Sequence, residues 1–313
     1  MDRFPVPYCS ADMSTPLSPR ALIIGGTGPT GPAIVRGLEE RGLNVTLFHT
    51  GRHEVDEVAH VEHLHGDPFS AEGVAAALAG RSFDVVVACY GRLRTIAEVL
   101  SGRCDRFVSV GGTPAYRGYF DPTRFDPPGL PIPTAEDAPR SSEDDDGKSY
   151  RVARTEDLLF EYQPSAIHLR YPFVYGPRQI APLDWCIVRR VLDRRPAIIL
   201  PEGGLAAETR SFSENAAHTV LLAVDHSDAG GRAFNVGDEE ALTAAQRVQL
   251  ICRELGHEMK IVGMPTDLAI PARPLMMQDE PGHRILDLSA TRDVLGYRDL
   301  VPARVATAQS ARW

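Results

Sequence analysis

Three evenly spaced glycines follow a short apolar run near the start of the chain. Leu22-Ile23-Ile24 leads directly into Gly25-Gly26-Thr27-Gly28-Pro29-Thr30-Gly31. In a strand-turn-helix unit the first glycine makes a tight turn, the second lets the backbone approach a pyrophosphate, and the third permits close packing of the helix. The free N–H groups of the helix then bind the phosphates. The segment predicts a dinucleotide site contacted by Gly25, Thr27, Gly28, Pro29, Thr30 and Gly31, with a purely structural turn as the alternative.

The end of the next apolar run bears on which dinucleotide is bound. An NAD site usually has Asp or Glu there, bonded to the adenosine ribose, whereas this chain has His49-Thr50-Gly51-Arg52. Thr50 and Arg52 suit a 2′-phosphate, because arginine is a permanent cation with several donors. The sequence therefore favours NADP(H) over NAD(H), and the alternative is that Arg52 is only a solvated loop residue.

Two further groups of polar residues follow. Asp67, in Gly66-Asp67 after the third apolar run, either bonds the adenine or caps the next helix. His60, His63 and His65 raise the question of a metal, because His63 and His65 share one face of a strand. No carboxylate or cysteine completes a recognisable set of ligands, so we expect a solvated strand face and no metal.

These residues need a scaffold of alternating strands and helices. Apolar runs of four or five residues alternate with amphipathic stretches, which is typical of a parallel sheet covered by helices on both faces. The pattern predicts an α/β, Rossmann-type doubly wound sheet with a smaller mixed C-terminal lobe. The expected strands are 22–24, 45–48, 61–65, 84–88, 106–110, 167–171, 198–200, 233–236 and 260–262, and the expected helices are 32–40, 150–161, 185–192, 214–224 and 244–255.

The chain divides into three predicted parts. Residues 1–19 are rich in proline and predict a flexible tail, 20–176 the dinucleotide-binding domain, and 177–313 mainly a substrate-binding lobe. Within the first domain, residues 119–149 are rich in proline and end in an acidic run. A loop of this length is usually a lid, a binding loop or disordered.

Composition excludes several classes of function. The net charge of −9 argues against a protein that binds nucleic acid through a broad cationic surface. No apolar run approaches the ~20 residues that span a bilayer, so no membrane partner is expected. The five scattered cysteines form no C-x-x-C pair and predict free thiols in a reducing cytoplasm.

Taken together, the order and spacing of the motifs resemble the extended short-chain dehydrogenase/reductases, which include the NAD-dependent epimerases and dehydratases. Only the proline-rich segment before Arg20 lies outside the resemblance. The matching segments are the glycine loop, Gly66-Asp67, Phe107-Val108-Ser109-Val110, Tyr150-x-x-x-Arg154 with Glu156, Leu169-Arg170-Tyr171-Pro172, Val174-Tyr175-Gly176-Pro177-Arg178, Arg210-Ser211-Phe212, Phe234-Asn235-Val236-Gly237, Asp287-x-Ser289 and Leu295-Gly296-Tyr297.

The resemblance implies a catalytic set. In that family a tyrosine exchanges a proton with the substrate oxygen, a lysine four residues later lowers the tyrosine pKa, and a Ser or Thr after the fifth strand holds the same oxygen. Tyr150 is then the acid/base, but the lysine position holds Arg154, which cannot shuttle a proton. The hydroxyl position falls on Gly112, so Thr113 is its proposed replacement, or else only a turn residue.

The same resemblance supplies substrate contacts and an assembly. Arg210 occupies the place of a substrate-phosphate arginine, Arg178 is a second candidate, and a homodimer is implied. The leading hypothesis is an NAD(P)-dependent oxidoreductase of carbonyl reductase or secondary alcohol dehydrogenase type, acting on a small-molecule substrate. The alternatives are a sugar-nucleotide epimerase or dehydratase with tightly bound cofactor, and a redox-inactive NADP(H) sensor, which Arg154 and Gly112 make credible.

Overall fold

The computed structural model describes residues 18–124, 126–145, 147–275 and 282–313. The predicted tail, residues 1–19, falls outside the described residues except for its last two positions, as does Cys9. The four cysteines that are described are free thiols (Cys89, Cys104, Cys186 and Cys252). In the part of the chain that is described, no helix is long and apolar enough to cross a membrane.

A seven-stranded parallel sheet organises the larger lobe. Its strand order is β11-β6-β5-β4-β1-β2-β3, so neighbours in the sheet are joined by crossovers and the order reverses between β1 and β4. The predicted Rossmann-type α/β fold is confirmed. The strands are β1 (Arg20–Ile24), β2 (Asn44–His49), β3 (Glu62–His65), β4 (Phe83–Ala88), β5 (Cys104–Gly112), β6 (Ile167–Tyr171) and β11 (Arg232–Asn235).

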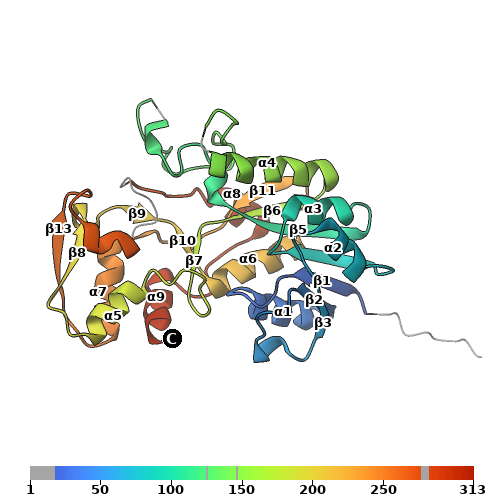
Figure 1. Cartoon of the computed structure of the whole chain (residues 1–313), viewed down its shortest axis with the longest axis horizontal. Helices are drawn as coiled ribbons and strands as arrows, with labels where there is room; N and C mark the ends of the chain where they lie inside the picture. Colours follow the sequence, from blue (N-terminus) through green and yellow to red (C-terminus); the bar gives the residue numbers. More distant parts are fainter. Residues whose placement is uncertain (1–17, 125, 146, 276–281) are drawn as a thin grey trace, which may run out of the picture.

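Helices cover both faces of this sheet (Figure 1). On one face lie α1 (Gly31–Glu40) and α6 (Ser213–Asp225), packed over a core that includes Ile34, Leu38 and Val220. On the other lie α2 (Ala71–Ala77), α3 (Leu93–Val99) and α4 (Gly147–Tyr162), over a core that includes Ile96 and Leu159. Burial on both faces explains why the strands read as continuous apolar runs.

A smaller lobe lies at the opposite end of the molecule (Figure 1). Its own apolar core includes Ile187, Leu200 and Ile251. Its elements are α5 (Trp185–Leu192), β8 (Ala197–Pro201), α7 (Ala244–Glu254), β13 (Lys260–Met264) and α9 (Ala303–Arg312), with β9 (Ala207–Glu208) paired to β12 (Leu242–Thr243). Two parallel strands, β7 (Phe173–Tyr175) and β10 (Arg210–Phe212), run between the lobes.

The chain does not keep to one lobe after residue 176. α6, β11 and α8 (Ser289–Leu295) all return to the larger lobe, and β11 supplies the seventh strand of its sheet. The segment 119–149 is also partly tied to that lobe. Thr134 donates its N–H to the carbonyl of Ile285, and Ser141 donates its N–H to the carbonyl of Ala115.

Candidate functional site

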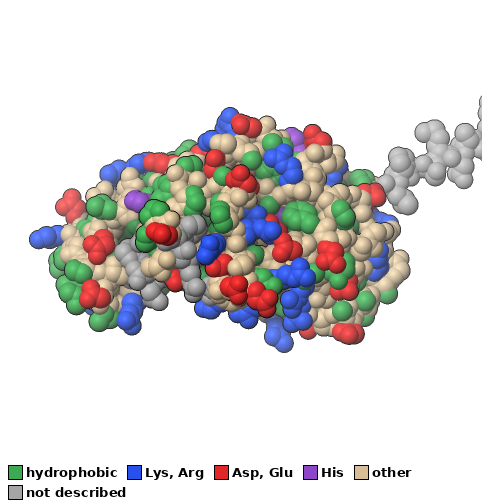
Figure 2. Space-filling model, turned by 90° about the horizontal axis from the view of Figure 1, so that it is seen from above, with side chains coloured by type: hydrophobic (Ala, Val, Ile, Leu, Met, Phe, Trp, Pro, Cys, Tyr) green, Lys and Arg blue, Asp and Glu red, His purple; other side chains and the backbone are tan. Residues whose placement is uncertain are grey.

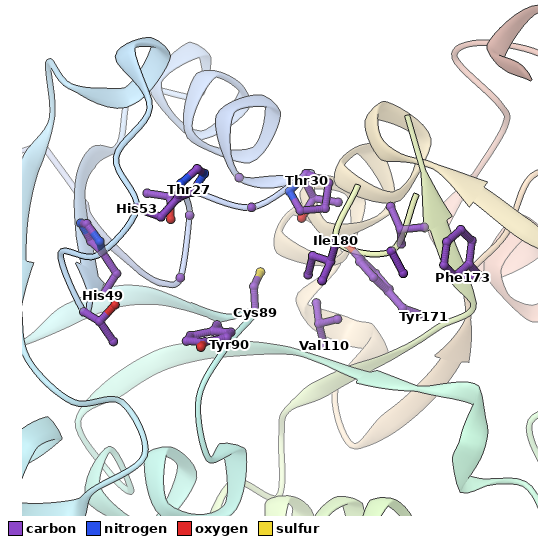
Figure 3. Close-up of a pocket in the computed structure, with 18 of the residues that line it drawn as sticks. Thr27, Thr30, His49, His53, Cys89, Tyr90, Val110, Tyr171, Phe173 and Ile180 are labelled. Carbon is purple, nitrogen blue, oxygen red and sulfur yellow. The ribbon is translucent and has the colours of Figure 1, made fainter. Parts of the chain in front are cut away.

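A cavity of about 1000 Å³ opens at the carboxyl ends of β1, β2, β4 and β5. This edge of the sheet, where the strand order reverses, is where open α/β folds bind ligands. One end, called here the glycine-loop end, is lined by the loop 25–31, His49, Thr50, Arg52, His53 and Asp67. The other, the aromatic end, is lined by Val110, Thr113, Tyr119, Phe120, Tyr171, Phe173 and Ile180. Figure 3 shows Val110, Tyr171, Phe173 and Ile180 gathered at this end, away from His49 and His53.

The glycine loop has the geometry that a pyrophosphate requires. Gly25 and Gly26 have φ of +107° and +89°, which residues with side chains rarely adopt. Gly31 lies so close to the loop that a Cβ there would be 2.0 Å from the carbonyl oxygen of Gly26. At Gly28 a Cβ would meet no atom of the chain within 4 Å, so its backbone faces open space. The free N–H groups at the start of α1 adjoin the same cavity.

The polar side of the glycine-loop end comes from the segments after β2 and β3. Thr50 and Arg52 both line the cavity, as the sequence predicts, and His49 and His53 join them. Glu54, the first acidic residue after β2, contacts His49, His63 and His65. An acidic group of the kind that usually binds the ribose is therefore absent from the described lining after β2, and that lining holds one permanent cation, Arg52.

Asp67 also lines the cavity. It does not cap the following helix: Ser70 caps α2, accepting the N–H of Gly73, while Asp67 accepts the N–H of Phe69. The helix-cap alternative for Asp67 is therefore wrong, and its contact with adenine stays a prediction.

The aromatic end holds one buried hydroxyl of particular interest. The side chain of Thr113 is 1% exposed, and its Oγ1 has no hydrogen-bond partner among the described residues. Such groups are rare in native proteins because an unmade bond costs about 1–3 kcal/mol. Thr113 follows β5 in the turn Thr113–Ala115, so the strand delivers it to the cavity. A ligand oxygen or nitrogen at the aromatic end would satisfy it once the lining shifts to expose Oγ1, which the chain now covers.

Two other polar side chains near this end, Cys89 and Tyr171, stay protonated near neutral pH. Burial raises the pKa of the Cys89 thiol to about 12, so it stays protonated near neutral pH. Burial also raises the pKa of Tyr171, whose hydroxyl donates to the carbonyl of Ala216. Neither group is available as a nucleophile or proton shuttle.

The structure does not bring Tyr150 and Arg154 to the cavity. Neither is among the described lining residues, and Arg154 is exposed. The rotation of α4 explains this, because Glu156 points into the protein and is held there by Arg170. At 100° per residue, Tyr150 and Arg154 lie roughly 120° and 160° around the helix from Glu156. The catalytic role of Tyr150 stays a prediction.

Lys148, on another side of α4, does approach the cavity wall. Its Nζ lies 6.0 Å from the ring centroid of Phe120, which lines the aromatic end. At 100° per residue, Lys148 and Tyr150 lie roughly 160° apart around α4, so Lys148 is a poor substitute for a cation one turn after Tyr150. Lys148 is therefore a cation of α4 that lies beside the lining, whereas Tyr150 and Arg154 are not part of it.

Arg178 and Arg210, the predicted substrate-phosphate contacts, are bound elsewhere. Arg178 pairs with Glu57. Arg210 is 7% exposed, donates to Glu208 at 2.9 Å and to Asp184 at 3.3 Å, and lies behind the ring of Phe173. Neither lines the cavity, and the only Arg or Lys in the described lining is Arg52, at the opposite end.

A buried polar network behind the aromatic end was not predicted. Arg170 donates to both oxygens of Glu156 at 2.9 and 2.6 Å and to the hydroxyl of Tyr116 at 2.8 Å, and Tyr116 donates to Asn235 at 2.6 Å. The network joins α4, β6, β11 and the segment after Thr113. Burial alone would raise the pKa of Glu156, but Arg170 outweighs it and lowers that pKa. The spacing of Ser149, Ala153 and Glu156 could have predicted that Glu156 is buried, because the three residues share one face of the helix. This buried face sets the rotation of α4.

The chain has distant relatives among curated proteins, whereas no family model matches it. It is 27% identical over 274 residues to the 3-diazoavenalumate denitrifying reductase of a Streptomyces species, covering 81% of this chain and 84% of the reductase. It is 24% identical over 244 residues to the chloroplast stem-loop binding protein of 41 kDa b of Arabidopsis thaliana. That alignment covers 72% of this chain but only 60% of the plant protein.

Solved structures share the whole architecture. The UDP-glucose 4-epimerase of Thermotoga maritima, solved with UDP-glucose, superimposes with a TM-score of 0.74 at 16% identity, covering 94% of this chain and 97% of the epimerase. The enzyme WbmH of Bordetella bronchiseptica, solved with NAD⁺, gives 0.71 at 17% identity over 94% and 97% of the two chains. The fold is that of the extended short-chain dehydrogenase/reductases. The predicted resemblance is therefore confirmed at the level of the fold.

Proposed function

We propose that this protein is an NAD(P)-dependent oxidoreductase that acts on a small, largely apolar molecule bound at the aromatic end of the cavity. The observation that carries the proposal is the unpartnered buried hydroxyl of Thr113, in the same cavity as a glycine loop fitted to a pyrophosphate. The alignment with the Streptomyces reductase, which extends over most of both chains, also supports the proposal.

The residues present fit a nicotinamide dinucleotide. The loop 25–31 and the start of α1 would hold the pyrophosphate, Asp67 the adenine, and Thr50 with Arg52 a 2′-phosphate, which favours NADP(H) over NAD(H). A bound nicotinamide supplies or accepts a hydride. WbmH, solved with NAD⁺, shows that a protein of this fold takes a nicotinamide dinucleotide.

Thr113 gives the aromatic end a single fixed point for a polar atom. Its hydroxyl can donate to a carbonyl oxygen or accept from an alcohol, and a substrate so placed has its remaining surface against Val110, Tyr171 and Phe173. Tyr119 and Phe120, from the predicted loop 119–149, complete that wall and exclude water from it. Water exclusion strengthens the hydrogen bond that Thr113 makes.

The sugar-nucleotide epimerase alternative rests on the solved neighbours of the same fold. It needs a clamp for the substrate diphosphate, and the two arginines expected to form one are engaged with Glu57, Glu208 and Asp184. This arrangement favours an uncharged substrate. Stoichiometric nicotinamide that survives dialysis of the purified protein would restore the epimerase hypothesis.

Binding of nucleic acid is not part of the proposal, despite the name of the plant relative. On the face shown in Figure 2, Lys and Arg side chains are interspersed with Asp and Glu rather than gathered into one basic band. Nonspecific nucleic-acid binding depends on many cations acting together. The homodimer implied by the family resemblance is carried forward as a proposal, to be tested by light scattering.

Two measurements test the proposed function. Titration with NADPH and NADH, followed by nucleotide fluorescence, should show binding of NADPH at least about tenfold tighter, or ~1.4 kcal/mol. Carbonyl compounds are then screened for oxidation of NADPH. If neither nucleotide bound, the glycine loop would be structural and the proposal wrong; binding without turnover of any carbonyl would favour the sensor alternative.

Variants then locate the chemistry. Thr113→Val keeps the shape of the side chain but removes the hydroxyl, and we expect kcat to fall by roughly 30-fold, or ~2 kcal/mol, with NADPH affinity unchanged. Tyr150→Phe tests the acid/base role that the family resemblance implies for Tyr150, and retained turnover would contradict that role. Thr155→Val, on the outer part of α4, is the matched control. The opposite result, loss with Tyr150→Phe and none with Thr113→Val, would return the acid/base role to Tyr150.

A further inference from the structure

Four side chains of metal-ligand type meet beside the glycine-loop end. His49 ends β2, His63 and His65 lie on β3, and Glu54 comes from the loop that follows β2. From each, one ligand atom lies within 4.8 Å of the others. From the sequence no metal is expected, because no carboxylate or cysteine near His60, His63 and His65 completes a recognisable set of ligands. The fold supplies Glu54 as that carboxylate and His49 as a third imidazole.

Several separations within this cluster match those of ligands around one small cation, and the longest is within 4.8 Å. Zn²⁺ binds imidazole nitrogen and carboxylate oxygen at about 2.0–2.2 Å, so the ligand atoms of a tetrahedral site lie roughly 3.3 Å apart. Glu54 Oε2 lies 3.3 Å from His63 Nδ1 and 3.8 Å from His49 Nε2, and Glu54 Oε1 lies 3.3 Å from His65 Nε2. His49 Nε2 and His63 Nδ1 are 2.9 Å apart.

The protein around the cluster orients its members as metal sites require. His63 Nε2 lies 2.9 Å from the carbonyl oxygen of Val58 and donates to it, which leaves the lone pair of Nδ1 directed at the cluster. A ligating histidine that donates its other N–H to a carbonyl is a recurrent arrangement. Gly51, with φ of +71°, brings its backbone against the ring of His65 and so turns the loop towards Glu54.

A hydrogen-bonded cluster without metal is the competing explanation. In that state Gly51 donates its N–H to His49 Nδ1 at 3.3 Å, and His49 Nε2 donates to His63 Nδ1. A cation bound to Nε2 takes the place of that proton, His49 becomes protonated on Nδ1 by exchange with solvent, and the long contact with Gly51 opens. His65 and Glu54 have side chains about half exposed, so a cation can reach the cluster directly from solvent.

We propose that His49, Glu54, His63 and His65 form a binding site for a divalent transition metal of the Zn²⁺ type. Three imidazoles and one carboxylate favour Zn²⁺ and Co²⁺ over Mg²⁺ and Ca²⁺, which prefer oxygen ligands. The metal would join β2, β3 and the loop that carries Thr50 and Arg52. The site stands on its own geometry and requires no bound nucleotide.

The test uses the full chain, purified without a histidine tag and stripped of metal with a chelator. Titration with Co²⁺ alone should give one equivalent per chain and the intense visible absorption of four-coordinate Co²⁺. Added Zn²⁺ should displace the Co²⁺ and abolish that absorption. Absence of the absorption at saturating Co²⁺ would overturn the four-ligand site.

Variants separate this site from other surface histidines. His63→Ala combined with His65→Ala should weaken Zn²⁺ binding by roughly 100-fold. Glu54→Gln, at an exposed position that leaves the fold intact, should weaken it at least about tenfold. His60→Ala is the matched control, because His60 lies 3.0 Å from Glu39 and outside the cluster. Equal Zn²⁺ binding by the wild type and the double variant, with both chains folded by circular dichroism, would contradict the proposal.

Discussion

The two ends of the cavity are built in different ways. The glycine-loop end is made by short continuous segments, the loop 25–31 and the residues that follow β2 and β3. The aromatic end is assembled from five places: β5, the turn after it, residues 119–120, the β6–β7 junction and Ile180. A site carried by one local segment can be recognised in sequence, whereas a composite site depends on how helices and strands are rotated against each other.

The largest expected effect comes from the glycine loop. Gly31→Val would place side-chain atoms against the Gly26 carbonyl and should weaken dinucleotide binding at least ~100-fold, or about 2.7 kcal/mol. Gly28→Ala is the more specific test of the phosphate site, because an added Cβ there meets no atom of the chain. We expect its melting temperature to be unchanged and its affinity to fall about tenfold. Normal affinity in Gly28→Ala would show that the pyrophosphate does not lie over Gly28.

The next effect concerns His168, a buried residue that packs against β5 two residues before Thr113. Burial lowers the pKa of His168 to about 4, and a Cβ at Gly111, two residues before Thr113, would be 2.4 Å from its Nε2. His168 therefore stays neutral in the fold while the unfolded chain takes up a proton below pH about 6.5. Stability contributed by neutral His168 is present above that pH and is lost as the pH falls towards about 4.

We expect the free energy of unfolding to drop by about 2 kcal/mol between pH ~7 and ~5 from this group. Urea unfolding at both pH values measures the drop, and His168→Gln should reduce it. His53→Gln serves as the control, because the side chain of His53 is exposed. An equal pH dependence in wild type and His168→Gln would mean that other groups carry the acid sensitivity.

The smallest effect tests cofactor selectivity at the glycine-loop end. Arg52→Gln removes the only cation of Lys or Arg type in the described lining, so NADPH affinity should fall about tenfold, ~1.4 kcal/mol, while NADH affinity is unchanged. Fluorescence titration of both nucleotides measures it. Arg36→Gln, exposed on α1, controls for general charge. Equal losses for NADPH and NADH would place Arg52 away from the 2′-phosphate.

The sequence predicted the parts of the fold that depend on local periodicity. Every strand expected in the larger lobe is present, because apolar runs buried on both faces leave a strong signal. The predicted places of the glycine loop, Thr50 and Arg52 in the cavity lining are also found, because each directly follows such a strand. The spacing of Tyr150 and Arg154 matched a family pattern, yet Glu156 sets the rotation of α4 and turns both away from the lining.

What the sequence could not give are the contacts made across the sheet. The meeting of Glu54 and His49 with His63 and His65 depends on the pairing of β2 with β3, in which His49 lies opposite His65. Burial of Arg210 against Asp184 likewise required the smaller lobe to be in place. These contacts join residues nine or more positions apart, and no single segment carries their signature.

The return of the chain to the larger lobe makes the two lobes inseparable. A fragment ending at residue 176 would lack β11 and leave β6 as an edge strand, with Ile167 and Leu169 still meant for burial. Exposed apolar edges pair with other chains and aggregate. An exchange of the smaller lobe between relatives, by recombination or by design, therefore has to include α6 and β11. Because the lobe cannot be exchanged alone, specificity at the aromatic end changes more readily by point substitution.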